Sequence, residues 1–281
     1  MISITQEPPR TTLMRPVTTT GIGIHTGMLA SVRLQPASGP TGIRFHRVDR
    51  EAFVSVSPDA IRGSDRATVL SDNSVIIRTP EHLLAALYAS GITDLDIHID
   101  NTEVPIVDGS ALPWIQLLQA AGKTAIPGRC KPPVVIQKAI RLCEGACETT
   151  QLLAIPDKDF KITYILNHEP HWVGIQVVHG KLETDWFINT IAPARTFGFA
   201  SDLAALQAQG LASGASVDNC LGITDTGYTR PLRVEKELAC HKILDIIGDL
   251  AILGRAIQGH IIGIHSGHAL NLRLVAELAS L

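Results

Sequence analysis

Four polar side chains interrupt an apolar segment near the C-terminal end of the chain. Residues 240–250 read CHKILDIIGDL, with polar side chains at His241, Lys242, Asp245 and Asp249. In an α-helix, at roughly 100° per residue, these four would gather on one face and the isoleucines and leucines on the other. His241 and Asp245 would stand one turn apart, close enough to share a hydrogen bond or a metal ion. The stripe fits either a solvated helix face or, because lysine and glutamate are scarce around it, one wall of a cleft.

A second candidate pair lies at the start of another predicted helix. In PEHL, Glu81 and His82 fall in the first turn. The helix dipole there disfavours imidazolium and keeps His82 neutral, as a metal ligand must be. Neighbouring helical residues point about 100° apart, so one could bind a metal while the other reaches a water on it. The alternative is that Glu81 only stabilises the dipole and His82 only makes a local hydrogen bond.

A third candidate is His268 in IHSGHALN, where it follows a glycine between a predicted strand and a predicted helix. A side chain at such a turn projects from the edge of a sheet. It could equally be a turn histidine bonded to the backbone, and the segment alone does not decide.

Together these residues have the composition of a catalytic zinc site. Such sites usually combine three histidine or carboxylate ligands with one water. His82, His241 and Asp245 would supply the ligands. Glu81 would then act as general base, which predicts a hydrolase that activates water. The HExxH motif is absent, and the sequence does not establish that residues 82 and 241 meet.

The predicted elements follow one order in both halves of the chain. In the first half we expect strands, a helix, a strand and a helix, with a polar loop or small insertion between the first strands and the first helix. These segments are 10–56, 57–74, 79–91, 95–101 and 108–122, in which Thr79 would cap the first helix, Pro80 would open it and Gly91 would end it. Residues 125–133, rich in glycine and proline, are the best candidate linker.

The second half repeats this order. The predicted segments are strands within 134–192, a short helix at 201–210, a long helix at 235–254, a strand at 258–267 and a final helix at 271–281. The polar stripe therefore belongs to the long helix, and His268 belongs to the turn that precedes the final helix.

Composition excludes several classes of protein. The chain has 281 residues, is 45% hydrophobic and carries a formal net charge of −3, so it can bury a large core and offers no electrostatic basis for binding nucleic acid. No apolar run reaches the roughly 18 residues of a transmembrane helix, and we expect no secretory signal. The five cysteines are scattered, which predicts a reducing, cytoplasmic environment.

Six motifs, in this order along the chain, resemble those of a known family. They are GIGIHTG (21–27), PEHLLAAL (80–87), EVPIVDGSA (103–111), PARTFGF (193–199), HKILDIIGDL (241–250) and SGHALN (266–271). Together they resemble the UDP-3-O-acyl-N-acetylglucosamine deacetylases, the zinc amidases of lipid A biosynthesis. The resemblance extends from about residue 10 to residue 280.

The resemblance implies an α+β fold of two similar β-α-α-β two-layer domains, with the active site between them and an insert in each. We place the first domain at 1–127, with its insert near 55–75. The second domain would span 128–281, with an insert near 197–220 that would hold an acyl chain.

The resemblance also implies a reaction. The enzyme would remove the N-acetyl group from UDP-3-O-(3-hydroxyacyl)-N-acetylglucosamine and release acetate, which is the committed step of lipid A biosynthesis. Zinc would be held by His82, His241 and Asp245. Glu81 would be the general base, and His268 would protonate the leaving amine or stabilise charge.

Further side chains acquire roles by the same resemblance. Thr196 would help to hold the oxyanion, and Asp249 would orient His268. Lys242 would reach the sugar-nucleotide part of the substrate, whose wall would include Phe197 and Asp202. An acyl channel or ordinary core would contain Ile191, Phe197, Phe199, Leu203 and Leu206.

The chain departs from the family pattern at a few positions. Ser201 and His265 stand where basic residues are expected, and Ala215 stands where a second glycine is expected after Gly214. Ala215 and Ala212 would alter the bore of an acyl channel. These departures concern chain length and substrate contacts rather than the reaction.

Two alternatives remain open. The chain could be a zinc deacetylase of another N-acyl sugar, or a sugar-nucleotide binding protein without catalytic activity. In each case we expect a small-molecule partner and a monomer. Bound zinc would argue against the second alternative, since a binding module does not need it.

Overall fold

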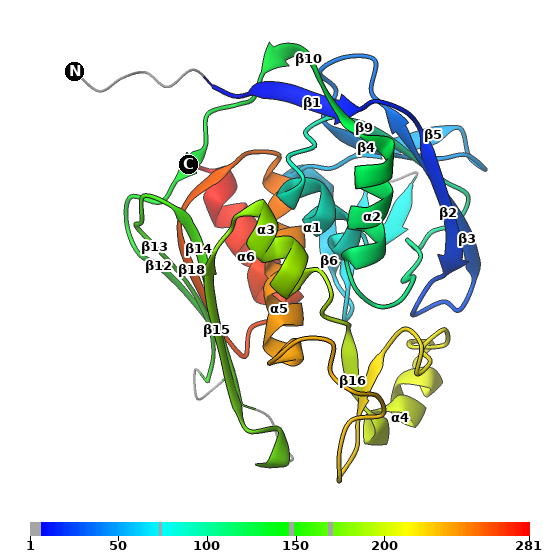
Figure 1. Ribbon diagram of the computed structural model, residues 1–281, viewed down its shortest axis with the longest axis vertical. Helices are drawn as coiled ribbons and strands as arrows, with labels where there is room; N and C mark the ends of the chain where they lie inside the picture. Colours follow the sequence, from blue (N-terminus) through cyan, green and yellow to red (C-terminus); the bar gives the residue numbers. More distant parts are fainter. Residues whose placement is uncertain (1–6, 73–74, 146–148, 168–170) are drawn as a thin grey trace.

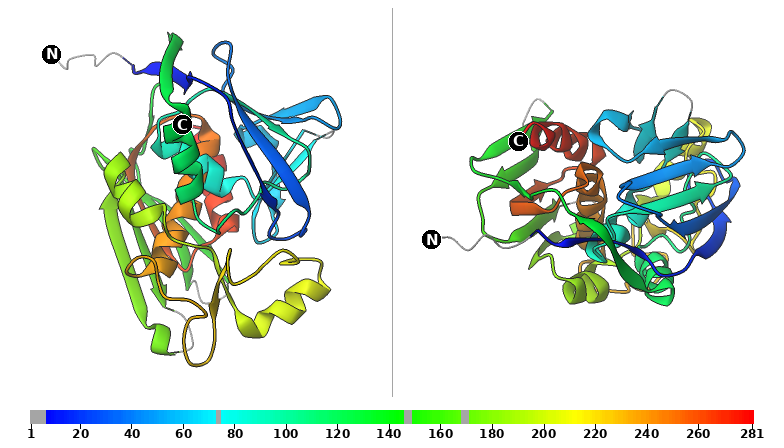
Figure 2. Two further views of the ribbon diagram at one scale, coloured as in Figure 1. Left: turned by 45° about the vertical axis from the view of Figure 1, so that its right-hand side comes forward. Right: turned by 90° about the horizontal axis from the view of Figure 1, so that it is seen from above.

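The computed structural model describes residues 7–72, 75–145, 149–167 and 171–281. Its two largest sheets face each other across a layer of helices, as Figure 1 and both views of Figure 2 show. The first sheet comes from the N-terminal half of the chain and the second from the C-terminal half. This arrangement confirms the expected α+β fold class.

Five strands form the first sheet, in the order β2-β3-β9-β4-β5. β4 and β9 run parallel, and the other neighbours run antiparallel. Alternate side chains, such as Val32, Leu34 and Ile97, are buried in the core. The strands are β2 (Val17–Ile22), β3 (Leu29–Pro36), β9 (Leu95–Ile99), β4 (Ile43–Arg47) and β5 (Ala52–Ser55).

The second sheet repeats this plan in the order β12-β13-β18-β14-β15, again with its parallel pair, β14 and β18, at the third and fourth positions. Short β11 (Val134–Val135) also pairs with β18. The strands of the main path are β12 (Ile140–Glu144), β13 (Thr150–Ile155), β18 (Ile257–Ile264), β14 (Phe160–Asn167) and β15 (Ile175–Lys181). The two halves therefore share one topology, while the domain boundary at residue 127 stays a prediction.

The expectation of an irregular linker at 125–133 is wrong for its first part. Strand β10 (Lys123–Arg129) crosses this region and pairs antiparallel with β1 (Pro9–Leu13). The register shifts between Pro9 and Arg10, opposite Pro127 and Gly128. Such a bulge accommodates a proline, which cannot donate to the ladder.

The longer helices lie between the sheets or beside them (Figures 1 and 2). α1 packs against both α2 and α5, and α5 packs against α6 and the second sheet. They are α1 (Glu81–Ala89), α2 (Leu112–Ala121), α5 (Glu237–Leu250, followed by the 3₁₀ turn Ala251–Leu253) and α6 (His268–Ala279). None of the helices in the described part of the chain has both the length and the hydropathy of a membrane-spanning helix.

The start of α1 differs from the sequence expectation. Thr79 is not the cap: its backbone is left-handed, with φ 55°, and its hydroxyl donates to Glu103 (3.1 Å). Pro80 occupies the N-cap position, and its carbonyl accepts from Leu84. The helix therefore begins at Glu81 and places this residue and the next in its first turn.

Both inserts are structured. Residues 73 and 74 of the polar stretch at 57–74 lie outside the described residues. The described part, 57–72, is not only a loop, because it contributes two strands to a three-stranded sheet of β6 (Ile61–Ser64), β7 (Thr68–Ser71) and β8 (Ile76–Arg78), preceded by the 3₁₀ turn Pro58–Ala60. The second insert contains β16 (Phe197–Phe199), a 3₁₀ turn (Ala200–Asp202), α4 (Leu203–Ala208) and β17 (Leu221–Ile223).

The expectation of strands throughout 134–192 is wrong at its end. There the chain forms α3 (Thr184–Trp186) and a π-helical turn (Phe187–Ile191). Phe187 and Ile191 are fully buried one turn apart, which explains why this segment reads as apolar without being a strand. A further 3₁₀ turn spans His171–Val173.

Candidate metal centre and active-site cavity

Helix α5 carries its polar stripe inside the molecule. His241 and Asp245 are each 2% exposed, and Asp249 is fully buried. The interpretation of the stripe as a solvated helix face is therefore wrong. Buried polar side chains need partners, and these come from α1, α6 and the first insert.

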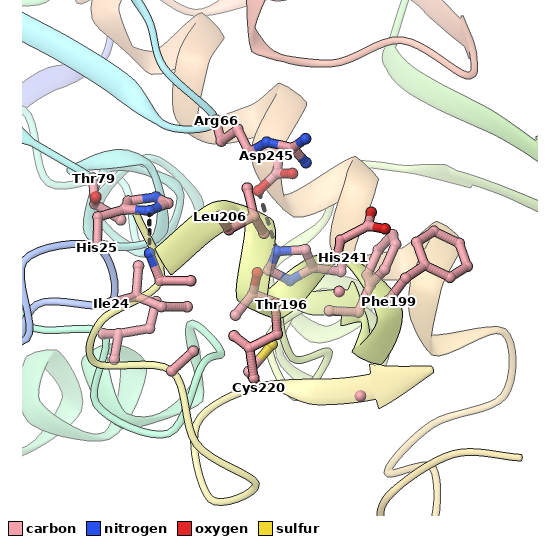
Figure 3. A pocket seen from close by; sticks show the side chains of 18 of the residues that line it. Ile24, His25, Arg66, Thr79, Thr196, Phe199, Leu206, Cys220, His241 and Asp245 are labelled. Atoms are coloured by element: carbon pink, nitrogen blue, oxygen red, sulfur yellow. Dashed lines mark hydrogen bonds and ion pairs between the residues drawn. The ribbon is translucent and has the colours of Figure 1, made fainter. Parts of the chain in front are cut away.

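A close crossing of α1 and α5 brings the two halves of the candidate site together. A Cβ atom on Gly248 would lie 2.1 Å from the carbonyl oxygen of Glu81, so only glycine permits this approach. The crossing sets His82 beside α5, with its Nε2 3.7 Å from Asp245 Oδ1. His241 Nε2 lies 3.4 Å from the same oxygen, and Figure 3 shows His241 and Asp245 facing one another.

The hydrogen bonds of His241 determine which of its ring nitrogens is free. Its Nδ1 lies 3.1 Å from the carbonyl oxygen of Ala194, which can only accept, so Nδ1 carries the proton. Burial lowers the pKa of His241 and keeps the ring neutral. Its Nε2 therefore presents a lone pair to Asp245.

His82 and Asp245 are also in the protonation states that metal ligands need, a neutral ring and an ionised carboxylate. Burial and then the neighbouring His241 lower the pKa of His82 to about 3. Burial would raise the pKa of Asp245, but Lys242 and the histidines outweigh it and hold that pKa below its usual range. Ligand atoms of the three residues all lie within 4.8 Å of one another. Converging lone pairs of two neutral imidazoles and a carboxylate fit a metal cation such as zinc.

Glu81 lies beside this cluster, in the first turn of α1. Its carboxylate is buried and accepts a hydrogen bond from the backbone N–H of Thr68 (3.3 Å). Burial, opposed by the neighbouring His268 and reinforced by Asp249 and Asp245, raises the pKa of Glu81 to about 8. The side chain is thus able to exchange a proton near neutral pH.

His268 begins α6 and faces both carboxylates. Its Nδ1 lies 2.8 Å from Asp249 Oδ2, and its Nε2 lies 3.7 Å from Glu81 Oε1. Burial alone would lower the pKa of His268, but Asp249, Asp245 and Glu81 outweigh it and raise the pKa to about 10. The ring, whose side chain is 10% exposed, is a cation next to the candidate base.

Two residues that hold Asp249 had not been singled out from the sequence. Thr68 Oγ1 donates to Asp249 Oδ1 (2.5 Å), and Asn271 Nδ2 donates to Asp249 Oδ2 (2.8 Å). Asn271 was visible as the last residue of SGHALN. Thr68 was not, because it lies in the stretch interpreted as a loop.

A buried ion pair fixes the ARTF segment on the start of α5. Arg195 donates through Nε and Nη2 to the carboxylate of Glu237 (2.7 and 3.0 Å), in the first turn of the helix. The backbone N–H of Arg195 also donates to Glu237 (3.0 Å). This ion pair places Ala194 against His241 and Thr196 beside the cluster. In the sequence, Arg195 was part of the PARTFGF motif, but no role was predicted for it.

Lys242 does not point freely into solvent. Its Nζ donates to Asp245 Oδ2 (2.7 Å) and lies 5.8 Å from the centre of the Phe197 ring. Burial would lower the pKa of Lys242, but Asp245 outweighs it and raises that pKa. Asp245 thus turns one oxygen to the histidines and the other to a lysine.

One cavity of about 590 Å³ joins this polar centre to both inserts (Figure 3). Thr196, Phe197 and Asp202 line it, and the ring centre of Phe197 lies 6.1 Å from that of His241. Its apolar part, here called the apolar arm, is lined by Ile24, Phe199, Leu203, Leu206, Ala212, Ala215 and Val217. Ile191 is not part of this wall, because it is fully buried in the core.

Ser201 and His265, the other two positions that depart from the expected motif pattern, do not line the cavity. Ser201 donates to Asp202 Oδ1 (3.1 Å). His265 adopts a left-handed backbone, with φ 53°, in the turn before α6.

Comparisons with known proteins agree with the motifs. A family model described as UDP-3-O-acyl N-acetylglycosamine deacetylase matches residues 10–280. The chain is 39% identical to the UDP-3-O-acyl-N-acetylglucosamine deacetylase of Syntrophotalea carbinolica, over 96% of this chain and 87% of the relative. It is 39% identical to that of Leptospira biflexa, over 96% and 90%, and 38% identical to that of Thermodesulfovibrio yellowstonii, over 96% and 92%.

Proposed function

We propose, because this chain belongs to the UDP-3-O-acyl N-acetylglycosamine deacetylase family, that it hydrolyses the N-acetyl group of UDP-3-O-(3-hydroxyacyl)-N-acetylglucosamine. Acetate is released, and the amine product proceeds to lipid A. One observation carries the proposal beyond family membership: the buried cluster of His82, His241 and Asp245 lines the same cavity as the apolar arm. An acylated sugar nucleotide has the same two-part chemistry.

The cluster is the proposed zinc site. Zinc held by His82, His241 and Asp245 would supply a Lewis acid for the amide carbonyl, would lower the pKa of a bound water to about 7 and, by its charge, would lower the pKa of the neighbouring Glu81. The Nδ1 hydrogen bond from His241 to Ala194 fixes the ring with Nε2 toward the site.

The chain's own groups would move the protons. Glu81 takes the proton of the attacking water, for which its position in the first turn of α1 and its pKa near neutrality are suited. His268, cationic and oriented by Asp249, gives a proton to the leaving nitrogen or stabilises developing charge. The hydroxyl of Thr196 donates to the oxyanion.

The remaining residues would bind the substrate. Lys242, beside Phe197 and Asp245, faces the sugar-nucleotide part, with Phe197 and Asp202 as its wall. The acyl chain occupies the arm lined by Phe199, Leu203 and Leu206. The cytoplasmic location and the monomeric state remain predictions.

The substitution Glu81→Ala tests the assignment of the base. We expect acetate release from the acylated UDP-sugar to fall on the order of 10²–10⁴-fold in kcat, because a general base is lost. Zinc content, measured by elemental analysis, should stay at the wild-type level, because Glu81 is not a ligand. Glu235→Ala is the matched control, since the Glu235 side chain is 87% exposed. Wild-type turnover in Glu81→Ala would refute the assignment.

A further inference from the structure

Glu103 is a buried carboxylate outside the metal cluster and the proton-transfer groups. It is 1% exposed. Oε1 accepts from the backbone N–H of His25 (2.9 Å) and from Thr79 Oγ1 (3.1 Å). Oε2 accepts from the N–H and the hydroxyl of Thr26 (2.8 and 2.7 Å). Four donors therefore converge on one side chain, which balances the cost of burying its charge.

The loop at residues 23–27 is folded around this carboxylate. A Cβ on Gly23 would lie 2.2 Å from Glu103 Oε2, so any larger residue would have to displace the carboxylate that the loop closes on. The backbone N–H of Gly27 donates to the carbonyl of Gly23 (3.0 Å) and completes the turn. The conformation of the loop thus depends on Glu103 rather than on apolar packing alone.

The outer side of the same loop holds the second insert. The N–H groups of Ser213 and Gly214 donate to the carbonyls of His25 and Ile24 (3.1 and 3.0 Å). A Cβ on Gly214 would lie 2.2 Å from the carbonyl oxygen of Gly23, so the two backbones are in direct contact.

A side chain of the loop adds one more bond to the insert. The N–H of Ala212, a residue with left-handed φ of 53°, donates to His25 Nδ1 (3.4 Å), as Figure 3 shows at His25. Backbone carbonyls of the loop and one of its side chains therefore both hold the segment 212–214 of the insert.

These contacts end at the apolar arm of the cavity. Ile24 on the loop and Ala212, Ala215 and Val217 on the insert all line it. We propose that Glu103 is a positioning residue that sets the bore of this arm, through the loop 23–27 and the insert segment 212–215, and so determines which acyl-chain lengths bind. The inference rests on the proposed function, which assigns the arm to an acyl chain.

The test compares three variants of the zinc-loaded protein. Glu103→Gln keeps the shape of the side chain but turns an amide NH₂ toward donors that need an acceptor. Gly214→Ala breaks the contact between loop and insert at a distance from Glu103. Asp94→Asn is the matched control, because Asp94 is also a fully buried carboxylate with several donors, but these include Arg10 and Gly42 and none from the loop 23–27.

The probe is a series of straight-chain primary alcohols of increasing length, whose binding is measured by calorimetry, with thermal unfolding as a check of folding. We expect Glu103→Gln and Gly214→Ala to lose affinity for the longest alcohols that the wild type binds, on the order of tenfold. The shortest alcohols should bind as before. Asp94→Asn should lower stability and keep the wild-type dependence on chain length.

An unchanged dependence on chain length in folded Glu103→Gln would overturn the inference, and so would an equal loss at every length or the same change in Asp94→Asn. Acetate release by the wild type is measured separately. Release of acetate together with an unaffected Glu103→Gln variant defeats only the role of Glu103. Failure of the wild type to release acetate defeats the proposed function, while the alcohol series still reports on Glu103.

Discussion

At the scale of single residues, the site depends on neighbouring groups whose pKa values are driven apart. Burial lowers the pKa of His82 to about 3, whereas three carboxylates raise the pKa of His268 to about 10 against the effect of its own burial. Two histidines of one pocket thus take different states, one suited to bind a metal and one suited to donate a proton. The pKa of Glu81, which burial raises to about 8, lies between the pKa values of these two histidines.

The substitution His241→Ala should remove metal and activity together. One of three ligands is lost, so the affinity for zinc should fall by more than the roughly 10–100-fold typical of losing an outer hydrogen-bond partner. Zinc titration and acetate release check this. His179→Ala is the control, because His179 is exposed on β15 and bonds Thr163 away from the cavity. Wild-type zinc content in His241→Ala would mean that the ligand is misassigned.

At the scale of elements, the turns before the site helices adopt unusual backbone conformations. Thr79 precedes α1, Lys236 precedes α5 and His265 precedes α6, and all three have φ between 53° and 55°. A left-handed backbone costs a non-glycine residue on the order of 1–3 kcal/mol. Packing and hydrogen bonds, such as that of Tyr164 Oη to the carbonyl of Ser266 (2.6 Å), hold the last of these turns in place.

Gly248→Ala should disturb the crossing on which the cluster depends. The added methyl group would meet the backbone of Glu81 at 2.1 Å, so α1 must shift away from α5. We expect a loss of about 1–3 kcal/mol in the free energy of unfolding, as for other overpacked cores, together with weaker zinc binding. Denaturant unfolding and zinc titration measure both effects.

Gly39→Ala controls for the general effect of removing a glycine, because a Cβ at Gly39 meets open space. Zinc binding in Gly248→Ala as tight as in the wild type would show that the close crossing does not position the ligands.

The sequence predicted the polar face of α5 from its periodicity, but it could not predict that α1 lies against that face. The meeting of His82 with His241 depends on a helix crossing at Gly248, a contact between residues far apart in the chain. Likewise, Thr68 was missed because a strand as short as the four-residue β7 carries little periodicity. The cap at Thr79 was wrong because its backbone is left-handed rather than extended and its hydroxyl is turned toward the buried Glu103.

At the scale of the whole molecule, two sheets of one topology enclose the helices, and the cluster takes ligands from α1 in one half and α5 in the other. The family resemblance predicted two similar domains with the site between them, whereas the order of the elements alone indicated only a repeated layout. Because both inserts line the cavity, the proposed substrate binding would draw on the same two halves as the proposed metal site. A metal that links them should also stabilise the folded chain.

The most direct test of the account is acetate release from UDP-3-O-acyl-N-acetylglucosamine before chelation, after chelation, and after zinc is restored. The account predicts that release stops when the metal is removed and returns with zinc, because His82, His241 and Asp245 are proposed to hold the metal that the reaction needs. Release that persists in fully metal-depleted protein, or its absence in protein shown to contain zinc, would contradict the account.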